Sequence, residues 1–417
     1  MRINRTALVM LGSTMVVGLA GCSSPSTSPA AKGQAVTITF QEQFNDAQTK
    51  AMEPLVSRFE TENAGIKVKL NRNNDSATYY AKLVTQITAG SGPDIARVEP
   101  PKASQYVAAG WVVPIGNATG DPAGYFPAAA KPVMKGDQLY GVPFEVEALE
   151  LFYRKDLLAK AGFDKPPATW EDFVKVANAL TGPGRYGTGL FGGWGAYQFY
   201  PWLWQAGAEM LNNDGTKAVF NSPEAVKALQ LWVDLQKTVM PPGMATGTED
   251  DVKGLFIAGR LAMFTSGPWV IPSLKAAGID GKWAIAPLPS GAQSATVLGG
   301  WDLLVLKNSK HPDQAKAFLS WLMQDKNIRD YYLALGSLPV KTSLAHDPAF
   351  TNDPYISEQA AILGQPGQAR SRPSGAAAGD VDAALGKAMQ AGLAGTLSPQ
   401  QALDTGVKEA NAALSGK

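Results

Sequence analysis

The sequence predicts an α/β protein with room for two hydrophobic cores. Stretches in which apolar residues alternate are followed by stretches in which they recur at helical spacing, and this order repeats along the chain. The 417 residues, 45% of them hydrophobic and 18% charged, suffice to bury two cores. Strands that alternate with helices in this way build a mainly parallel sheet with helices on both faces.

The pattern begins with a strand-helix-strand unit. Residues 36–40 and 66–70 alternate as strands do, and residues 52–59 between them carry apolar side chains at helical spacing. A further helical stripe over residues 80–87 ends at the turn sequence GSGP, residues 90–93. We therefore expect β-α-β-α order in this part of the chain.

Helix-start signals mark a second set of elements after residue 140. Thr169 is placed to cap one helix, and Ser222 is followed by a proline, which suits the first turn of another. Ser398 and Pro399 repeat this arrangement before the last apolar stripe. The chain is therefore expected to end in a packed helix.

The first 22 residues have the layout of a secretory signal. Arg2 and Arg5 precede a mostly small and apolar run over residues 7–20, and Leu-Ala-Gly-Cys ends it at Cys22. A membrane-spanning helix is the alternative, but it needs about 18 unbroken apolar residues, and this run is shorter. We expect residues 1–21 to be a signal peptide that lies outside the fold.

Cys22 is the only cysteine of the chain, so it has no disulfide partner within it. Its stretch resembles the bacterial lipobox, which implies that Cys22 carries a lipid and becomes the mature N-terminus. An ordinary cleavage site that happens to precede a cysteine is the alternative. Residues 22–34 are rich in Ser, Thr, Pro and Ala, a composition typical of a flexible tether.

The charge balance argues against a nucleic-acid partner. Lys and Arg total 37 and Asp and Glu total 36, so no overall field attracts a polyanion. No stretch after residue 22 is long and apolar enough to span a bilayer, so the sequence predicts membrane attachment only through the lipid on Cys22.

Six sequence stretches stand in the order found in the maltose-binding type of solute-binding protein. They are KLVTQITAGSGPDI (82–95), YGVPFEVEALELFYRKD (140–156), PATWEDF (167–173), FIAGRLAMFTSGPW (256–269), GGW (299–301) and QAKAFLSW (314–321). The chain resembles this family over nearly its whole mature length. The resemblance implies a non-enzymatic, monomeric protein without a cofactor or metal, which binds a sugar and delivers it to the permease subunits of an ABC importer.

The same resemblance implies a two-lobed periplasmic-binding-protein-like fold with a ligand cleft between the lobes. The N-terminal lobe is expected to comprise residues 35–144 plus 286–322. The C-terminal lobe is expected to comprise residues 145–285 plus 323–417. Composition and periodicity by themselves support only the α/β class and two cores.

A sugar has an apolar face and a rim of hydroxyls, so its site needs flat aromatic rings together with groups that bond hydroxyls. The candidate stacking residues are Trp194, Tyr197, Trp269 and Trp301. The family places sugar-contacting aromatics at Trp269 and Tyr197. Core packing is the alternative for every large ring, and we favour it for Trp202 and Trp204.

The candidate hydrogen-bonding residues are Gln41, Glu42, Asn74, Asp75, Glu99, Glu147, Asp302 and Arg372. Glu147 matches the family stretch that carries a hydroxyl-binding glutamate. Glu145 would point to the same side of an extended segment, as a second ligand group or as an ion-paired carboxylate. The remaining candidates follow strands or lie in loops, and strand ends are where α/β ligand sites gather.

Two departures from maltose binders argue for a different sugar. Pro101 and Lys102 stand where those proteins have an acid and an arginine, and residues 375–379 lack their stacking tryptophan. A binder of a glycerophosphodiester is the main alternative, since Lys102 and Arg372 offer cations for a phosphate. A secreted glycosidase that uses Glu145 and Glu147 is a remote alternative, because its two carboxylates must flank the bond.

Overall fold

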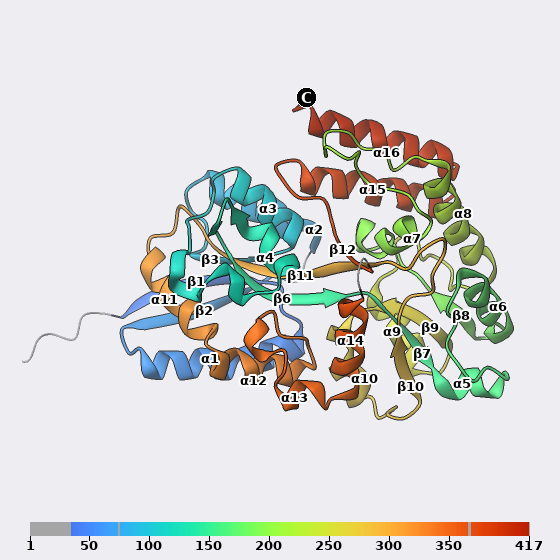
Figure 1. Cartoon of the computed structure of the whole chain (residues 1–417), viewed down its shortest axis with the longest axis horizontal. Helices are drawn as coiled ribbons and strands as arrows, with labels where there is room; N and C mark the ends of the chain where they lie inside the picture. The colour runs from blue at the N-terminus through green and yellow to red at the C-terminus, as the bar shows by residue number, and fades with distance from the viewer. Residues whose placement is uncertain (1–34, 74–75, 366–367, 417) are drawn as a thin grey trace, which may run out of the picture. The chain divides into compact units, whose positions relative to one another are not determined.

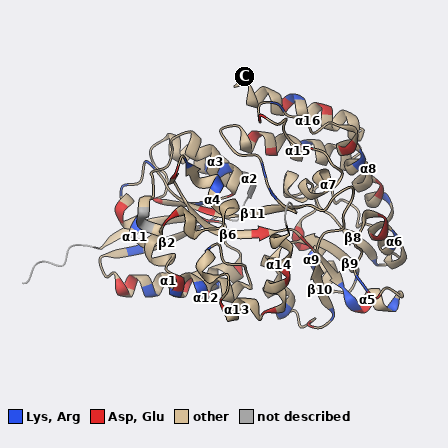
Figure 2. Ribbon diagram, in the orientation of Figure 1, with Lys and Arg blue, Asp and Glu red and all other residues tan. Residues whose placement is uncertain are grey.

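The computed structural model describes residues 35–73, 76–365 and 368–416 (Figure 1). The predicted signal peptide, the tether with Cys22, and the candidates Asn74 and Asp75 lie outside the described residues. Among the helices that are described, none is both long and apolar enough to cross a membrane. Basic and acidic residues are interspersed along outer helices such as α1 and α16 (Figure 2).

The first sheet has six strands in the order β12-β11-β3-β1-β2, with β6 paired to β11. The strands are β1 (Val36–Glu42), β2 (Ile66–Arg72), β3 (Ile95–Val98), β6 (Val142–Ala148), β11 (Thr296–Val305) and β12 (Ala369–Ser371). β1 pairs in parallel with β2 and β3, as the strand-helix-strand pattern predicts. β11 runs antiparallel to β3 and β6 and parallel to β12.

Helices pack on this sheet through their apolar stripes. They are α1 (Asp46–Glu62), α2 (Ser76–Thr88), α3 (Pro100–Ala108), α11 (Pro312–Leu322) and α12 (Asp325–Leu335). Asn45 starts α1 through a capping box with Gln48, which satisfies free backbone N–H groups at the helix start. Phe40 of β1 and Phe59 of α1 both contact Phe318 of α11 edge to face, so sequence-distant elements share one core.

The second sheet has four strands in the order β10-β7-β9-β8. They are β7 (Glu150–Arg154), β8 (Tyr186–Gly189), β9 (Leu261–Ser266) and β10 (Trp283–Ala286). The principal helices around it are α6 (Trp170–Leu180), α7 (Tyr200–Gln205), α8 (Pro223–Thr238), α9 (Glu249–Ile257), α15 (Ala378–Leu393) and α16 (Pro399–Leu414). Thr169, Ser222 and Ser398 cap α6, α8 and α16, so these predicted helix starts are confirmed.

Further helices and strands connect these elements. They are α4 (Pro127–Ala130), β4 (Met134–Lys135), β5 (Gln138–Leu139), α5 (Lys155–Lys160), α10 (Ile271–Ala276), α13 (Pro348–Thr351) and α14 (Pro354–Gly364). One residue, Leu149, separates β6 of the first sheet from β7 of the second. The chain therefore passes directly from one sheet to the other at this point.

Two hydrophobic clusters divide the buried residues. The first draws on residues 38–146 and 303–356, and the second on residues 149–297 and 381–410. Tyr331 of α12, which the expected division put in the C-terminal lobe, packs against Phe44 and Phe144 of the first cluster. Ala295 and Val297 pack in the second cluster, although the expected division put them in the first lobe. The rest of the division stays a prediction.

Candidate functional site

Three of the predicted aromatic residues lie together. Trp194 immediately precedes the short 3₁₀ helix η4 (Gly195–Gln198), which contains Tyr197, and Trp269 lies in η5 (Pro268–Val270) just after β9. The ring centroid of Trp194 is 5.6 Å from that of Trp269 and 6.4 Å from that of Tyr197. Trp194 is 37% exposed, so this aromatic cluster presents a ring to solvent.

The Trp269 ring is fixed by its neighbours. Its Nε1 donates a hydrogen bond of 2.7 Å to Oε1 of Glu249, and the Ser266 hydroxyl donates to the same oxygen. A side chain at Gly267 would place its Cβ 2.0 Å from the Trp269 ring, so this close approach requires glycine. Burial raises the pKa of Glu249 to about 7, although the two hydrogen bonds oppose the rise.

Glu249 is absent from the candidates that the sequence suggested. It is the first residue of α9, directly after the N-cap Thr248, and the capping box between Thr248 and Asp251 marks that helix start. The motif locates the helix but not its distance from Trp269, which depends on how α9 packs against β9.

Tyr197 approaches the first sheet at Gly299. A Cβ at Gly299 would lie 2.0 Å from the Tyr197 hydroxyl oxygen, so this close approach requires glycine. Gly300 has φ +117°, and its Cβ would lie 1.9 Å from the carbonyl oxygen of Glu145. The buried Tyr197 hydroxyl bonds no described residue and is thus available to a ligand.

Arg372 connects the first sheet region with α15. Both of its Nη atoms lie 3.1 Å from Oε2 of Glu99, the residue that precedes α3, and Nη1 lies 3.3 Å from Oδ1 of Asp382 on α15. Its guanidinium carbon is 5.0 Å from the centroid of the Tyr197 ring. The structure therefore joins three candidates, Arg372, Glu99 and Tyr197, in one group.

Glu145 and Glu147 differ although both lie buried on β6. Glu145 forms an ion pair with Arg97 and accepts hydrogen bonds from Gln48 Nε2 at 2.9 Å and the Tyr331 hydroxyl at 2.8 Å. The ion-paired interpretation of Glu145 is confirmed. No described residue bonds the Glu147 carboxyl, whose pKa burial and the neighbouring Glu145 raise. Glu147 is thus the carboxyl that remains free to meet a ligand.

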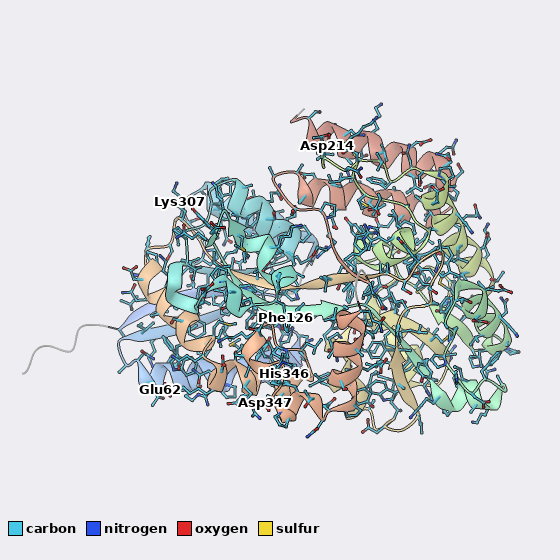
Figure 3. The ribbon with its side chains drawn as sticks, viewed as in Figure 1. Glu62, Phe126, Asp214, Lys307, His346 and Asp347 are labelled. Carbon is cyan, nitrogen blue, oxygen red and sulfur yellow. The ribbon has the colours of Figure 1, made fainter. Side chains whose placement is uncertain are left out.

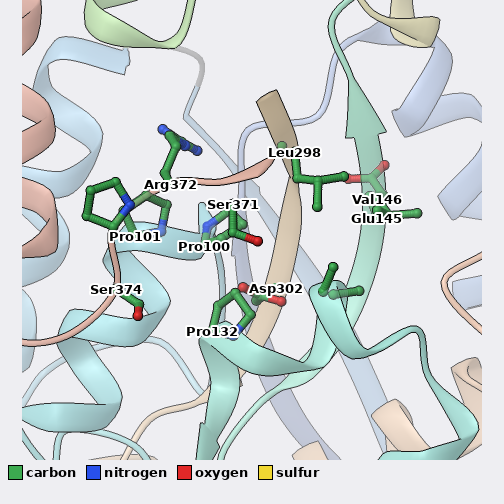
Figure 4. Close-up of a pocket in the computed structure, with 14 residues that line it drawn as sticks. Pro100, Pro101, Pro132, Glu145, Val146, Leu298, Asp302, Ser371, Arg372 and Ser374 are labelled. Carbon is green, nitrogen blue, oxygen red and sulfur yellow. The ribbon is translucent and has the colours of Figure 1, made fainter. Parts of the chain in front are cut away.

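An open pocket of about 430 Å³, which includes solvent space, lies beside Glu145 and Arg372 (Figure 4). Glu145, Gly299, Asp302 and Arg372 line it, and prolines such as Pro101 form part of its wall. Asp302 is 2% exposed, its Oδ2 bonds no described group, and burial raises its pKa. The pocket brings candidates from β6, β11 and the segment after β12 to one place.

Residues 54–358 match the bacterial extracellular solute-binding protein family. The chain belongs to this family. Because this family is extracellular, the protein is exported. Its relatives in the family are binding proteins.

Two relatives from Bacillus subtilis illustrate the likeness. The maltodextrin-binding protein MdxE is 26% identical over 347 residues, which cover 80% of each chain. The galactooligosaccharide-binding protein is 25% identical and covers 99% of this chain and 98% of its own. The likeness to the second relative therefore extends over nearly the entire sequence.

Solved structures confirm the two-lobed fold. A solute-binding protein of an ABC transporter from Thermotoga lettingae, bound with α-D-tagatose, has a TM-score of 0.83 at 28% identity and covers 91% of this chain and 99% of its own. Maltose-bound MalE3 from T. maritima has a TM-score of 0.83 at 27% identity, with 90% and 99% coverage.

Other predicted residues of the solute-binding protein lie apart from the aromatic cluster. Trp301 stacks on Arg97, whose guanidinium carbon is 3.8 Å from the ring centroid. Gln41 lines a separate polar groove with Thr37 and Thr39, since these three residues alternate on one face of β1. Glu42 accepts a hydrogen bond from the backbone N–H of Phe44, and burial raises its pKa.

Core packing explains the remaining tryptophans of the aromatic segment. Trp202 is fully buried and Trp204 is 2% exposed, as predicted.

Among the described residues, no group of three His, Cys, Asp or Glu side chains could hold a metal ion. His346 is exposed beside Asp347, which pairs with Arg329 (Figure 3).

Proposed function

We propose that the protein captures a neutral sugar, a di- or oligosaccharide, outside the cell and delivers it to the permease of an ABC importer. The observation that carries this proposal is the aromatic cluster of Trp194, Tyr197 and Trp269 beside the unbonded Glu147 carboxyl. Rings offer the apolar surface that a pyranose face stacks on, and the carboxyl and the Tyr197 hydroxyl can bond its hydroxyls.

The charges around the pocket favour a neutral ligand over a glycerophosphodiester. Arg372 already bonds two carboxylates, Glu99 and Asp382, and an anion would have to compete with both. Lys102 Nζ donates to Gln105 Oε1 at 3.2 Å and lies 5.9 Å from the Tyr80 ring centroid. A phosphate site is expected to offer a cation that is not already paired with carboxylates, and Arg372 is paired in this way.

The contacts of Glu145 support a binder over a glycosidase. That reaction needs two carboxyl groups on either side of the scissile bond. Glu145 is held by Arg97, Gln48 and Tyr331, so its carboxylate has no free face for proton transfer or attack.

Capture is proposed to occur by closure of two lobes around the sugar, which is the general behaviour of periplasmic binding proteins. The direct step from β6 to β7 through Leu149 offers a short connection about which the lobes can turn. The Arg372–Glu99 ion pair and the approach of Tyr197 to Gly299 are contacts that closure would form. The protein is proposed to act as a monomer, anchored to the cell membrane by a lipid on Cys22.

A thermal-shift screen tests the proposal. The probes are maltose, maltotriose, mannobiose, D-tagatose, ribitol, mannitol and glycerophosphocholine. We expect at least one carbohydrate to raise the melting temperature, with calorimetric binding and no chemical change of the probe after long incubation. A shift with glycerophosphocholine alone would favour the phosphodiester, and a cleaved product that disappears in Glu147→Gln would favour the glycosidase.

A further inference from the structure

Glu249 is a buried carboxyl group that meets the aromatic cluster from α9. It is 9% exposed, and its Oε1 accepts hydrogen bonds from Trp269 Nε1 and from the Ser266 hydroxyl. The indole N–H is the single donor of a tryptophan side chain, so this bond selects one orientation of the ring. The start of a helix also favours a negative charge at this position.

We propose that Glu249 is a positioning residue of the ligand site, which holds the Trp269 ring in the orientation that a bound sugar stacks on. The inference rests on the proposed function, because it requires Trp269 to contact the sugar. Gly267 lies against the same ring and leaves no space for a Cβ there, so backbone and carboxyl confine the ring from two sides. A preorganised ring avoids the loss of side-chain freedom on binding.

Several charged or polar groups face the Glu249 carboxyl. Asp250 and Lys253 lie on the same helix and pair with each other at 2.5 Å, Ser266 belongs to β9, and Glu147 of β6 interacts with it electrostatically. Burial holds the pKa of Glu249 near 7, and an ionised carboxylate accepts a hydrogen bond about twice as strongly as a neutral acid. Sugar affinity is therefore expected to be higher at pH 8 than at pH 6.

Two variants isolate this effect. Glu249→Gln keeps the size of the side chain and removes its charge. Asp250→Asn removes a neighbouring charge at the same helix start, but the Asp250 side chain is 84% exposed and does not bond Trp269. Because the pKa of Glu147 is also raised, the pH dependence of sugar affinity in the wild type is compared with that in Glu249→Gln.

The first measurement needs no sugar. In the ¹⁵N-labelled protein, the indole N–H resonance of Trp269 is assigned by its loss in Trp269→Phe. We expect this resonance to move with pH, with a midpoint near 7, in the wild type and in Asp250→Asn. It should stay fixed over that range in Glu249→Gln. A wild-type resonance that does not respond, or one that still moves in Glu249→Gln, would overturn the proposal.

The second measurement is a calorimetric titration with the sugar that gives the largest thermal shift among maltose, maltotriose, mannobiose and D-tagatose. Replacement of the charged acceptor by a neutral amide oxygen, which bonds the indole N–H more weakly, should lower its affinity about 2- to 10-fold in Glu249→Gln at pH 8. In the Trp269→Phe background, which lacks the indole N–H, the same substitution should have almost no effect.

The results distinguish failure of the positioning role of Glu249 from failure of the proposed sugar capture. If the full effect of Glu249→Gln persists in the Trp269→Phe background, Glu249 contacts the sugar itself and the positioning role is wrong. If the wild type binds a sugar and Trp269→Ala binds it equally well, the positioning role fails while sugar capture stands. If no carbohydrate of the thermal-shift screen binds the wild type, the proposed function fails.

Discussion

Both Nη atoms of Arg372 lie 3.1 Å from one carboxylate oxygen of Glu99, although 273 residues separate the two in the chain. The Arg372 side chain is 3% exposed and also bonds Asp382. One buried cation thus connects Glu99, the residue that precedes α3, with α15.

Loss of Arg372 should destabilise the protein. In Arg372→Ala the carboxyls of Glu99 and Asp382 lose their cation, and we expect the free energy of unfolding to fall by about 3 kcal/mol, the low end for a broken buried pair. Glu99 retains some solvation, since its side chain is 35% exposed. Urea unfolding at pH 7 measures the change.

Arg370→Ala is the matched control. Arg370 pairs with Glu209, whose side chain is 51% exposed, and such a pair contributes less than about 1 kcal/mol. Equal losses of stability in both variants would show that the Arg372 contacts are no stronger than a surface ion pair.

Trp269 and Trp202 should respond in opposite ways to substitution by alanine. Trp269→Ala removes the proposed stacking surface, and we expect affinity for the bound sugar to fall by roughly 2 to 4 kcal/mol, about 30- to 1,000-fold. Trp202 is fully buried, so Trp202→Ala should instead lower the free energy of unfolding by about 3 to 5 kcal/mol. Calorimetry and apo unfolding measure both effects, and unchanged affinity in Trp269→Ala contradicts the site assignment.

Glu145 and Glu147 form a second matched pair. Glu147→Ala leaves ligand hydroxyls without their partner and should lower affinity by about 1 to 3 kcal/mol, roughly 5- to 150-fold. The apo protein should lose little stability, because no described residue bonds this carboxyl and burial penalises its charge. Glu145→Ala strands the buried Arg97 and should cost about 3 to 5 kcal/mol of stability. Equal changes in affinity and in stability in the two variants would contradict the different roles of Glu145 and Glu147.

Glu150 should make stability fall as the pH rises. The residue is fully buried, neither of its carboxyl oxygens bonds a described group, and burial, with a smaller contribution from Glu358, raises its pKa well above 4.5. Above pH 4.5 the unfolded chain releases this proton while the folded protein retains it. Each pH unit between the unfolded and folded pKa therefore removes about 1.4 kcal/mol from the free energy of unfolding.

Glu150→Gln places a neutral amide at the same position. We expect it to be more stable than the wild type at pH 8 and close to it at pH 5, by chemical unfolding at both pH values. Parallel stability profiles for the two proteins would rule out titration of Glu150 over this range.

Cys22→Ala tests the predicted lipid anchor. No stretch after residue 22 is long and apolar enough to span a bilayer, so on the predicted lipid anchor the variant should move from the membrane fraction to the soluble exported fraction. Ser23→Ala, one residue further along, should leave the distribution unchanged. A Cys22→Ala protein that still sediments with membranes after salt washing contradicts the prediction.

Periodicity and capping signals predicted much of the local structure. The β1-α1-β2 unit and the helix starts at Thr169, Ser222 and Ser398 depend on neighbouring residues, because alternation and capping are local properties of the chain. Three of the predicted aromatics also lie together, yet Tyr197 and Trp269 were expected at the site from resemblance to a family and not from spacing. A short motif specifies a turn or cap but not the distance between two motifs.

Tertiary packing decided the rest. Glu145 and Glu147 share a face of one strand, and only the positions of Arg97, Gln48 and Tyr331 make the first a structural carboxylate. Residues 323–356 carry ordinary helical patterns, and the contacts of Tyr331 assign them to the first core. Sequence by itself determined the α/β order, the helix caps and the kinds of side chain available for a sugar. Which carboxyl stays free and which tryptophan is held by Glu249 depend on contacts between distant segments, whose geometry no local pattern encodes.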